Sequence, residues 1–330
     1  MRDVAALAGV SIKTVSRVIN GEQAVSADLT TRVTAAVDRL DYRHNMTASS
    51  LRRSDGRTAT IGVVLEDVAN PFSSALHRAI EDVAVARGVL VLAGSSDEDE
   101  DRERRLVSAF ASRRVDGLVI QPATHDHSFL ITERKAGTAI VFVDRPPAFL
   151  DADSVVTDNA AGVRRGVRHL IDHGHHQIGY LGDLHTIATA ADRYQGYVAE
   201  LAAEHIALDE RCVRLDIHGI DNAAAAVTDL LRGANPPTAL FTAQNLITIG
   251  AFRALRKLGL HQKIALIGFD DILLADLLEP AITVIAQEPA AIGRTAAETL
   301  FRRLDGDRSP AQHHVVPTRL IARGSGEIRP

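Results

Sequence analysis

The chain has 330 residues, more than one hydrophobic core usually organises, so we expect at least two structural units. Hydrophobic residues make up 46% and charged residues 24%, as in soluble globular proteins, and no apolar stretch approaches the ~18 residues of a membrane span. Cys212 is the single cysteine, and the N-terminus has no apolar signal core. An intrachain disulfide and a cysteine-based metal cluster are therefore excluded, and we expect a cytoplasmic protein with no membrane association.

The net charge of −5 is unevenly distributed along the sequence. Residues 1–57 carry a balance of +3, whereas the remaining residues carry −8. A basic N-terminal part on an acidic body suggests that the N-terminal part binds a polyanion. A solvated surface gives the same small excess by chance, so the charge alone does not decide the function.

The first residues predict three short helices. Val4–Ala8 has a helical pattern, and Gly9 suits the turn that follows it. Ser11 suits the cap of a second helix from Ile12 to about Ile19, whose apolar residues are spaced i, i+3, i+4. A third helix is expected after Ser26, and its inward-facing residues are expected to be Val33, Val37 and Leu40.

Three helices with a tight turn between the first two form a helix-turn-helix unit, whose second helix enters the major groove of DNA. Lys13 and Arg17 can then donate hydrogen bonds to guanine, and Ile12 can contact a thymine methyl group. The expected DNA contacts of this unit are Ser11, Ile12, Lys13, Thr14, Ser16, Arg17 and Asn20. The alternative is an ordinary three-helix bundle with solvated lysine and arginine side chains.

Longer stretches of the sequence resemble the LacI/GalR family of repressors. The resemblance is carried by Asp3–Ser11 and Thr14–Gly21, continues through Leu40–Arg43 and recurs as far as Arg323-Gly324. It implies a sequence-specific DNA-binding regulator that acts as a homodimer on a pseudo-palindromic, double-stranded operator. It also implies a small-molecule effector that is like a sugar or a nucleoside. Whether the effector releases DNA or promotes binding stays open, since the family contains both kinds.

Asn45–Leu51 resembles the hinge helix of this family. So short a segment is marginal as an isolated helix, and the resemblance implies that it folds on DNA and pairs with its counterpart in the minor groove. Leu51 then wedges into the central base step, with Ala48 one turn earlier on the same face. The alternative is a flexible linker with one stray leucine.

From Thr60 onward, short apolar runs alternate with helical patterns, which predicts parallel sheets covered by helices. Strands are expected at 61–65, 89–93, 117–120, 139–143, 177–181, 239–241 and 265–269. The pattern restarts after residue 159, and two such lobes resemble the periplasmic sugar-binding fold of the family's effector domain.

We therefore expect an α/β protein with an all-α helix-turn-helix head at 1–44, a hinge and linker at 45–57, and a two-lobed, periplasmic-binding-protein-like body at 58–330. Lobe 1 is expected at about 58–157 and 288–315, and lobe 2 at about 158–287 and 316–330.

Polar residues follow several predicted strands, and ligands of open α/β sheets bind at such ends. The family resemblance assigns effector contacts to Phe72, Asp144, Arg193, Gln244, Asp270 and Gln287. The alternative for each polar residue is a loop or helix cap. Two departures from the family argue against a copied ligand preference: Ser73 replaces a second aromatic residue after Phe72, and Gln244-Asn245 replaces Asn-Asp.

No glycine-rich nucleotide-binding motif follows a predicted strand, and Asp270-Asp271 has no apparent partner base, so we expect neither an enzyme nor a cofactor. His169, His173, His175 and His176 cluster near a turn, and residues 97–101 are all acidic. Structural histidines and a solvated helix start explain these features better than metal binding does. The chain ends without a heptad tail, so we expect no device for a tetramer.

Replacing Leu51 with Ala should weaken operator binding far more than binding to unrelated DNA, because only the specific complex needs the wedge. Titration of both kinds of duplex with the wild-type chain and with Leu51→Ala, at physiological salt, measures the two losses. An equal loss of affinity for both duplexes would exclude the wedge.

Overall fold

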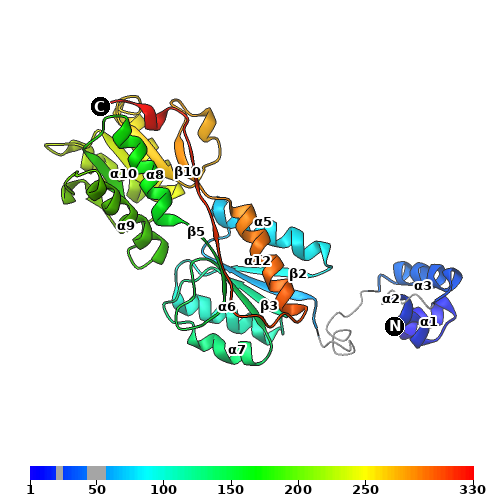
Figure 1. Cartoon of the computed structure of the whole chain (residues 1–330). Helices are drawn as coiled ribbons and strands as arrows, with labels where there is room; N and C mark the ends of the chain where they lie inside the picture. Colours follow the sequence, from blue (N-terminus) through cyan, green and yellow to red (C-terminus); the bar gives the residue numbers. More distant parts are fainter. Residues whose placement is uncertain (20–24, 43–56) are drawn as a thin grey trace. The chain divides into compact units, whose positions relative to one another are not determined.

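The computed structural model describes residues 1–19, 25–42 and 57–330, and it divides into two compact units, Met1–Thr58 and Ala59–Pro330 (Figure 1). We call the first unit the head and the second the body. The predicted DNA contacts Asn20, Ala48 and Leu51, and the predicted hinge helix 45–51, lie outside the described residues. In the described part of the chain, no helix is both long and apolar enough to cross a membrane.

The head contains α1 (Arg2–Ala8), α2 (Ile12–Ile19) and α3 (Ala27–Arg39), which pack around a small core. Gly9 ends α1 with a left-handed backbone, φ 63°, as its place in the sequence predicted. Val4, Val15 and Val33 are fully buried at the centre of this core. Each of the three helices thus contributes one valine to the same contact.

One predicted core residue of the head is not buried. Leu40 is 43% exposed, because α3 ends at Arg39 and Leu40 is the residue that caps it. Ala36 takes its place in the core, with Val37 half-buried beside it. The helical spacing was correct, but the helix ended one residue before Leu40.

Lobe 1 of the body is a parallel sheet with the strand order β11-β5-β4-β3-β1-β2. Its strands are β1 (Thr60–Leu65), β2 (Leu90–Ser95), β3 (Gly117–Ile120), β4 (Ala139–Asp144), β5 (Asp153–Thr157) and β11 (His313–Val316). Its helices are α5 (Pro71–Ala86), α6 (Glu100–Ser112), α7 (Ile131–Lys135) and α12 (Pro289–Leu304), with a short 3-10 turn at Ser128–Leu130.

Lobe 2 is a second sheet with the strand order β12-β10-β9-β8-β6-β7. Its strands are β6 (Ile178–Leu181), β7 (Val213–Arg214), β8 (Ala239–Thr242), β9 (Ala265–Phe269), β10 (Thr283–Ala286) and β12 (Arg319–Ile321). Its helices are α8 (Asn159–Asp172), α9 (Ala188–Ala203), α10 (Ile220–Arg232) and α11 (Asn245–Leu258), with short 3-10 turns at Glu210–Cys212, Ala275–Leu277 and Ser325–Glu327. The predicted fold class, a helical head with two α/β lobes, is confirmed.

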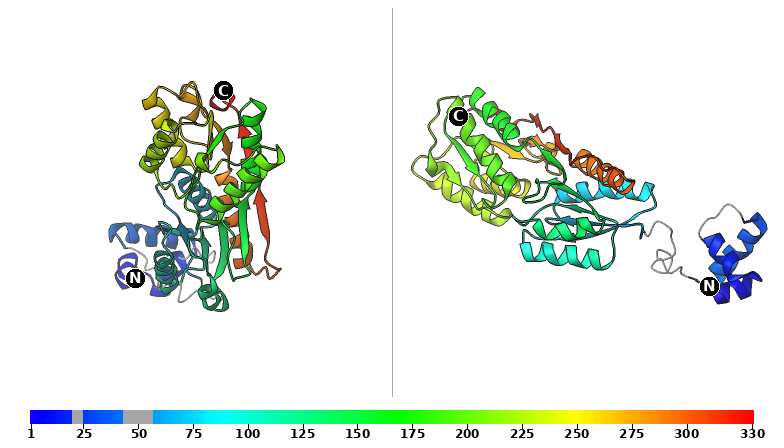
Figure 2. Two further views of the ribbon diagram at one scale, coloured as in Figure 1. Left: turned by 90° about the vertical axis from the view of Figure 1, so that its left-hand side faces the viewer. Right: turned by 60° about the horizontal axis from the view of Figure 1, so that its bottom comes forward.

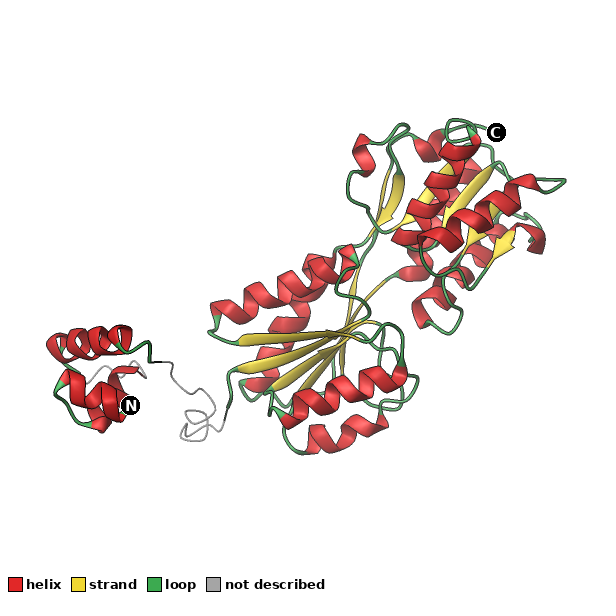
Figure 3. Cartoon of the chain, turned by 180° about the vertical axis from the view of Figure 1, so that it is seen from behind, coloured by secondary structure: helices red, strands yellow, loops and turns green. Residues whose placement is uncertain are grey.

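The chain passes between the lobes three times within residues 57–330: from β5 to α8, from β10 to α12, and from β11 to β12 (Figure 3). The third passage explains why β12 pairs antiparallel with β10, where the sequence predicted only parallel strands. β11 runs with the other lobe 1 strands and leaves lobe 1 at their carboxyl ends. The chain continues in the same direction, and it therefore enters lobe 2 from the carboxyl ends of that sheet.

Both faces of each sheet are covered by helices. In lobe 1, α5 and α12 lie on one face and α6 and α7 on the other (Figure 1). Alternate residues of β1 point into different cores, since Val63 packs under α5 and α12 while Val64 packs under α6. Burial on both faces explains why the strands read as unbroken apolar runs in the sequence.

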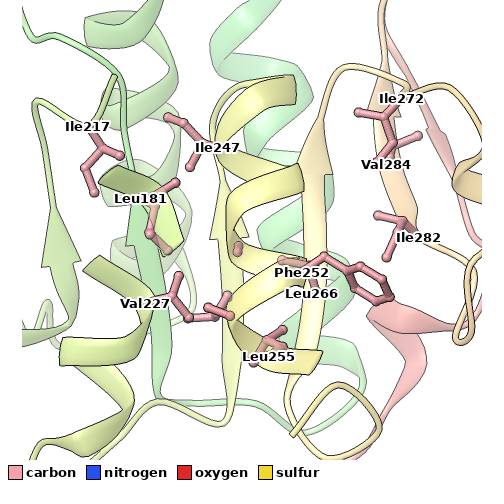
Figure 4. Close-up of a cluster of buried hydrophobic side chains, with 14 of the residues drawn as sticks. Leu181, Ile217, Val227, Ile247, Phe252, Leu255, Leu266, Ile272, Ile282 and Val284 are labelled. Atoms are coloured by element: carbon pink, nitrogen blue, oxygen red, sulfur yellow. The ribbon is translucent and has the colours of Figure 1, made fainter. Parts of the chain in front are cut away.

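The lobe 2 sheet is covered in the same way, by α8 and α9 on one face and by α10 and α11 on the other. Figure 4 shows the second of these two cores, where Val227 of α10 and Leu255 of α11 lie close to Leu266 of β9. β11 runs beside β5 in lobe 1, as the red and green strands of Figure 2 show. The last strand of lobe 1, β11, thus pairs with β5, the strand from which the first passage starts.

The close packing of α10 against α11 depends on Gly250. A Cβ atom at this position would lie 2.3 Å from the Ile220 carbonyl oxygen, which is backbone and cannot swing away. Gly250→Ala should therefore lower the free energy of unfolding of the body by about 2 kcal/mol, even though Ala is the better helix former by about 1 kcal/mol. Urea unfolding measures the change.

The matched control is Gly88→Ala, where φ is 68° and a Cβ atom would meet nothing within 4 Å. This variant carries only the backbone cost of about 1 kcal/mol. A Gly250→Ala variant as stable as the wild type would show that the two helices are not in close contact.

Candidate functional site

Helix α2 exposes the side chains that the sequence predicted to read bases. Ile12 is 45% exposed, and Lys13 and Arg17 are exposed as well, whereas Val15 on the opposite face is fully buried. An apolar methyl-bearing side chain and two cationic donors therefore share one solvent-facing surface. This is the arrangement that the major-groove interpretation needs, and the DNA contacts themselves stay predictions.

Ser11 and Thr14 are hydrogen-bonded to each other at the N-terminal end of α2. Ser11 Oγ accepts a hydrogen bond from the Thr14 N–H at 3.1 Å, and the two hydroxyl oxygens lie 2.9 Å apart. Ser11 is therefore the predicted cap. Ser16 is half-buried one turn further along. Arg32 of α3 donates to the Ala8 carbonyl at 2.7 Å, which fixes the turn before α2.

All six residues predicted to contact an effector line one cavity in the body. The cavity lies at the carboxyl ends of strands from both lobes and has a volume of about 30 Å³. Its lining residues are Glu66, Asn70, Phe72, Gln121, Asp144, Arg145, Asp183, Ile187, Thr189, Ala190, Arg193, Gln244, Asp270 and Gln287. A volume of this size is that of about one water molecule, so a sugar-sized ligand requires the lobes to separate or side chains to move.

Besides Asn70 and Arg145, three further charged or amide residues of this cavity are absent from the expected effector contacts. Glu66 follows β1, Gln121 follows β3, and Asp183 lies two residues after β6. Each obeys the rule that identified Asp144 and Asp270, namely a polar residue at the carboxyl end of a buried strand. The strand-end rule therefore applies to these three residues as well, although the family resemblance did not assign them to the site.

Two aspartates lie in equivalent places in the two lobes. Asp144 ends β4 and Asp270 follows β9, and both have a left-handed backbone, with φ of 68° and 73°. Such a backbone costs about 1–3 kcal/mol for a residue other than glycine and is common at binding sites. Both side chains are buried. The fold thus holds two aspartates with strained backbones at the cavity, and their carboxylates are buried there.

The lobe 1 wall of the cavity is a connected polar network. Gln121 donates to Asp144 Oδ2 at 3.1 Å and accepts the Glu66 backbone N–H at 3.0 Å. Arg145 donates to both carboxylate oxygens of Glu98, at 2.7 and 2.6 Å, and its Nε lies 3.4 Å from Asp144. Burial opposes the charge on Arg145, and these acidic neighbours outweigh it, so the pKa of its guanidinium is raised.

The lobe 2 wall is built around Arg193. Its Nε donates to Asn159 Oδ1 at 2.7 Å, its Nη1 donates to the Ala243 carbonyl at 2.8 Å, and its guanidinium stacks on the Phe269 ring at 3.9 Å. Gln287 donates to Asp270 Oδ1 at 2.6 Å. Burial raises the pKa of the Asp270 carboxyl, while Arg193 and the Gln287 hydrogen bond act in the opposite direction.

Gln244 and Asn245 have clear structural tasks. Gln244 Oε1 accepts the N–H groups of Leu246 and Ile247, so Gln244 is the cap of α11 that we had considered as the alternative. Asn245 Oδ1 also accepts the Leu246 N–H, at 2.7 Å. The Asn245 amide also donates to Asn70 Oδ1 at 2.8 Å, and this hydrogen bond joins lobe 2 to lobe 1.

Phe72 is half-buried in the first turn of α5, where it lines the cavity and also packs against the lobe 1 core. Ser73, which stands where the family usually has a second aromatic residue, is fully buried, with its hydroxyl 3.5 Å from Gln121 Oε1. The second aromatic ring is therefore replaced by a polar contact within lobe 1.

Two residues of the histidine cluster, His169 and His175, make hydrogen bonds that join separate segments of the fold. His175 is buried between the Thr238 hydroxyl and the Ile328 carbonyl, and His169 bonds Glu327 at 2.5 Å. No group of three or more potential ligands that could hold a metal ion occurs in the described ranges. In the acidic run, Asp99 caps α6 by accepting the Arg102 N–H.

Burial of the Glu66 carboxyl and, to a smaller extent, the nearby Glu98 carboxylate raise its pKa, Arg145 opposes both, and the resulting pKa is about 7. The unfolded chain ionises near 4.5, so the folded chain binds this proton more tightly. The free energy of unfolding should therefore fall by up to about 3 kcal/mol as pH rises from about 4.5 to about 7. Glu66→Gln should remove this part of the pH dependence, as urea unfolding at pH 5 and pH 8 would show.

The control for that measurement is Asp67→Asn, which removes a charge at the next residue outside the cavity lining and should keep the wild-type pH dependence. An unchanged slope in Glu66→Gln would mean that Glu66 ionises normally in the folded chain.

Comparison with known proteins agrees with this geometry. Residues 1–45 match the bacterial regulatory proteins of the lacI family, and residues 167–326 match the periplasmic binding protein-like domain. The HTH-type transcriptional regulator PtxS of Pseudomonas aeruginosa is 35% identical over 334 residues, which cover 100% of this chain and 96% of PtxS.

Two solved structures are similar over 98% of this chain and 98% of their own. The lac repressor dimer bound to operator and the anti-inducer ONPF gives a TM-score of 0.84 at 27% identity. The complex of the transcriptional regulator CelR with cellobiose gives 0.72 at 30% identity. These similar proteins are transcription regulators and not enzymes. The chain belongs to the LacI/GalR family of bacterial transcription regulators and carries a periplasmic-binding-protein-like effector domain.

Proposed function

We propose that this chain is a cytoplasmic repressor that binds a pseudo-palindromic operator as a homodimer, and that a small polyhydroxyl effector in the interlobe cavity sets its affinity for DNA. One observation carries the proposal: polar side chains from both lobes, including all six expected effector contacts, line a single cavity. The effector chemistry follows from this lining, because carboxylates, amides and an arginine are the groups that bind hydroxyls.

The head supports the DNA-binding part of the proposal. Lys13 and Arg17 are exposed on α2, and the helix start is held by Ser11 and by the Arg32 contact to the preceding turn. A rigid helix with exposed donors at its first two turns suits base recognition in the major groove. The lac repressor dimer, which is similar over nearly its whole length, was solved bound to operator.

Exposed apolar side chains on the body support the homodimer. Leu273 and Leu277, between β9 and β10, are 83% and 73% exposed. In lobe 1, Val85 of α5 and Leu90, the first residue of the edge strand β2, are exposed. Exposed apolar side chains and the edge of a sheet both favour association with a second chain. Both surfaces belong to the body, so the dimer does not require the head.

The small volume of the cavity indicates how an effector acts. The lobes are joined by the hydrogen bond from Asn245 to Asn70, and the remaining space holds about one water molecule. A sugar-sized effector therefore binds a more open body or reorganises this wall, and in either case it shifts the equilibrium between arrangements of the lobes. A coupling of ~1–3 kcal/mol would change operator affinity about 5- to 150-fold.

In-vitro selection of bound duplexes from a random pool, at physiological salt, tests the regulator directly. One palindromic motif is the expected result, and absence of any motif would contradict the proposal. The selected operator then serves to screen sugars and other polyols for a change in affinity. Arg17→Ala should lose preference at one base position, at a cost of about 1–3 kcal/mol.

The matched control is Arg232→Ala, which removes an exposed arginine from α10 of the body. It should select the wild-type motif with unchanged preference. If Arg17→Ala also selected the wild-type motif, Arg17 would not be a base-reading residue.

A further inference from the structure

We propose that the effector carries a positively charged amino group, and that the Glu66 carboxylate binds this group in the interlobe cavity, with Asp183 lining the same cavity from lobe 2. This inference rests on the proposed function, since it names the chemical class of the effector. It concerns a residue that neither the sequence pattern nor the family resemblance had assigned to the site.

The first argument is the charge of the cavity. Its lining contains four carboxylates, from Glu66, Asp144, Asp183 and Asp270, and two arginines, Arg145 and Arg193. A fifth carboxylate, that of Glu98, is bonded to Arg145 directly behind this wall. Carboxylates therefore outnumber the arginines around a small cavity, which favours a cationic ligand and opposes an acidic one.

The second argument is that the arginines are already engaged. Arg145 is held by the two oxygens of Glu98 and by the Pro122 carbonyl at 2.5 Å. Arg193 is held by Asn159, by the Ala243 carbonyl and by the ring of Phe269. Both side chains brace the walls of the cavity. Neither provides the fully uncommitted guanidinium that a carboxylate or phosphate ligand would bind in bidentate fashion.

The third argument is the state of Glu66. Its backbone N–H is bonded to Gln121, but within residues 57–330 no group donates a hydrogen bond to its carboxylate. Asp183, by contrast, is bonded to the Leu184 N–H at 2.8 Å and to His218 at 3.1 Å, and this contact raises the pKa of His218. Of the four carboxylates in the lining, Glu66 is thus the one that accepts no hydrogen bond from the described residues of the body, so its charge is left for a ligand cation to pair.

An independent observation points to a hydrogen-bond donor in the same cavity. Gln287 is only 7% exposed, and its Oε1 atom is buried without a hydrogen-bond partner. Its Nε2 is bonded to Asp270, so the free acceptor is the atom available to a ligand. An unsatisfied buried acceptor lowers stability, and a ligand N–H or O–H group would satisfy it.

An organic amine fits these observations better than a metal ion does. In the parts of the chain that the structure describes, no three potential metal ligands are grouped together. An ammonium group needs only one or two carboxylates, and the hydroxyl groups of the same molecule can bond Gln287 and Asp270. The expected effector is therefore an amino sugar or an amino polyol.

The experiment uses the full chain and a matched panel of probes. The panel consists of hexoses, the corresponding 2-amino-2-deoxyhexoses, their N-acetyl forms and the corresponding hexonates, each tested by titration calorimetry at pH 7.5. At least one amine should bind, and it should bind at least about tenfold more tightly than its uncharged hydroxyl and N-acetyl counterparts, as for one charge-assisted hydrogen bond. The hexonate should bind most weakly.

Glu66→Gln keeps the shape of the side chain and removes its charge. It should weaken amine binding at least about tenfold and leave binding of the hexose within about twofold, which a merely structural role would not do. Asp67→Asn, the neighbouring charge change outside the cavity lining, should leave both affinities as in the wild type.

Three results would overturn the inference. They are tighter binding of the uncharged or acidic probes, equal amine affinity in Glu66→Gln, and a panel in which no amine binds. In the second case Glu66 would act as a neutral carboxylic acid, which glutamine imitates. None of these results affects the operator selection, so the failure of this inference is distinguishable from failure of the proposed function.

Discussion

The meeting of two sheets at their carboxyl ends is the constraint on which the rest of the body depends. Three passages of the chain join the lobes, and they oblige β1, β3 and β4 of one sheet and β6, β8 and β9 of the other to end at one cavity. The strands themselves are buried on both faces and cannot carry polar groups at low cost. Polar side chains therefore collect where the strands end, and the cavity receives them from both lobes.

This collection of polar groups is stabilised by internal hydrogen bonds. Asp144 and Asp270 have a left-handed backbone, and neighbouring groups hold both in place, since Gln121 bonds the first side chain and Gln287 the second. The Asp270 N–H also donates to the Ile285 carbonyl at 2.9 Å. Strain and buried charge at this place lower stability, but they leave acceptors preorganised for a ligand. The unpaired oxygen of Gln287, the Nε of Arg145, which makes no hydrogen bond, and the buried carboxylate of Glu66 are among the remaining costs.

The same interactions connect ligand binding to the arrangement of the lobes. Asn70 caps α5 of lobe 1 by accepting the Phe72 N–H, and it also accepts the hydrogen bond from Asn245 at the start of α11 in lobe 2. A ligand that enters a cavity of about 30 Å³ must displace one of these walls. Because the hydrogen bond joins the first turns of two rigid helices, its loss is transmitted to whole lobes rather than to a single loop.

Local rules in the sequence determined the helices of the head, the cap at Ser11, the turn at Gly9 and the alternation of strands and helices, because each depends on residues close together in the chain. The family resemblance, rather than these local rules, assigned the six expected cavity residues, four of which lie at or just beyond strand ends. Only the tertiary structure decided the exposure of Leu40, the antiparallel course of β12 and the pairing of Arg145 with Glu98. It also decided that none of the described residues donates a hydrogen bond to the Glu66 carboxylate. These features depend on where a helix stops and on which segments, far apart in the sequence, are brought together, and periodicity and spacing carry no information about either.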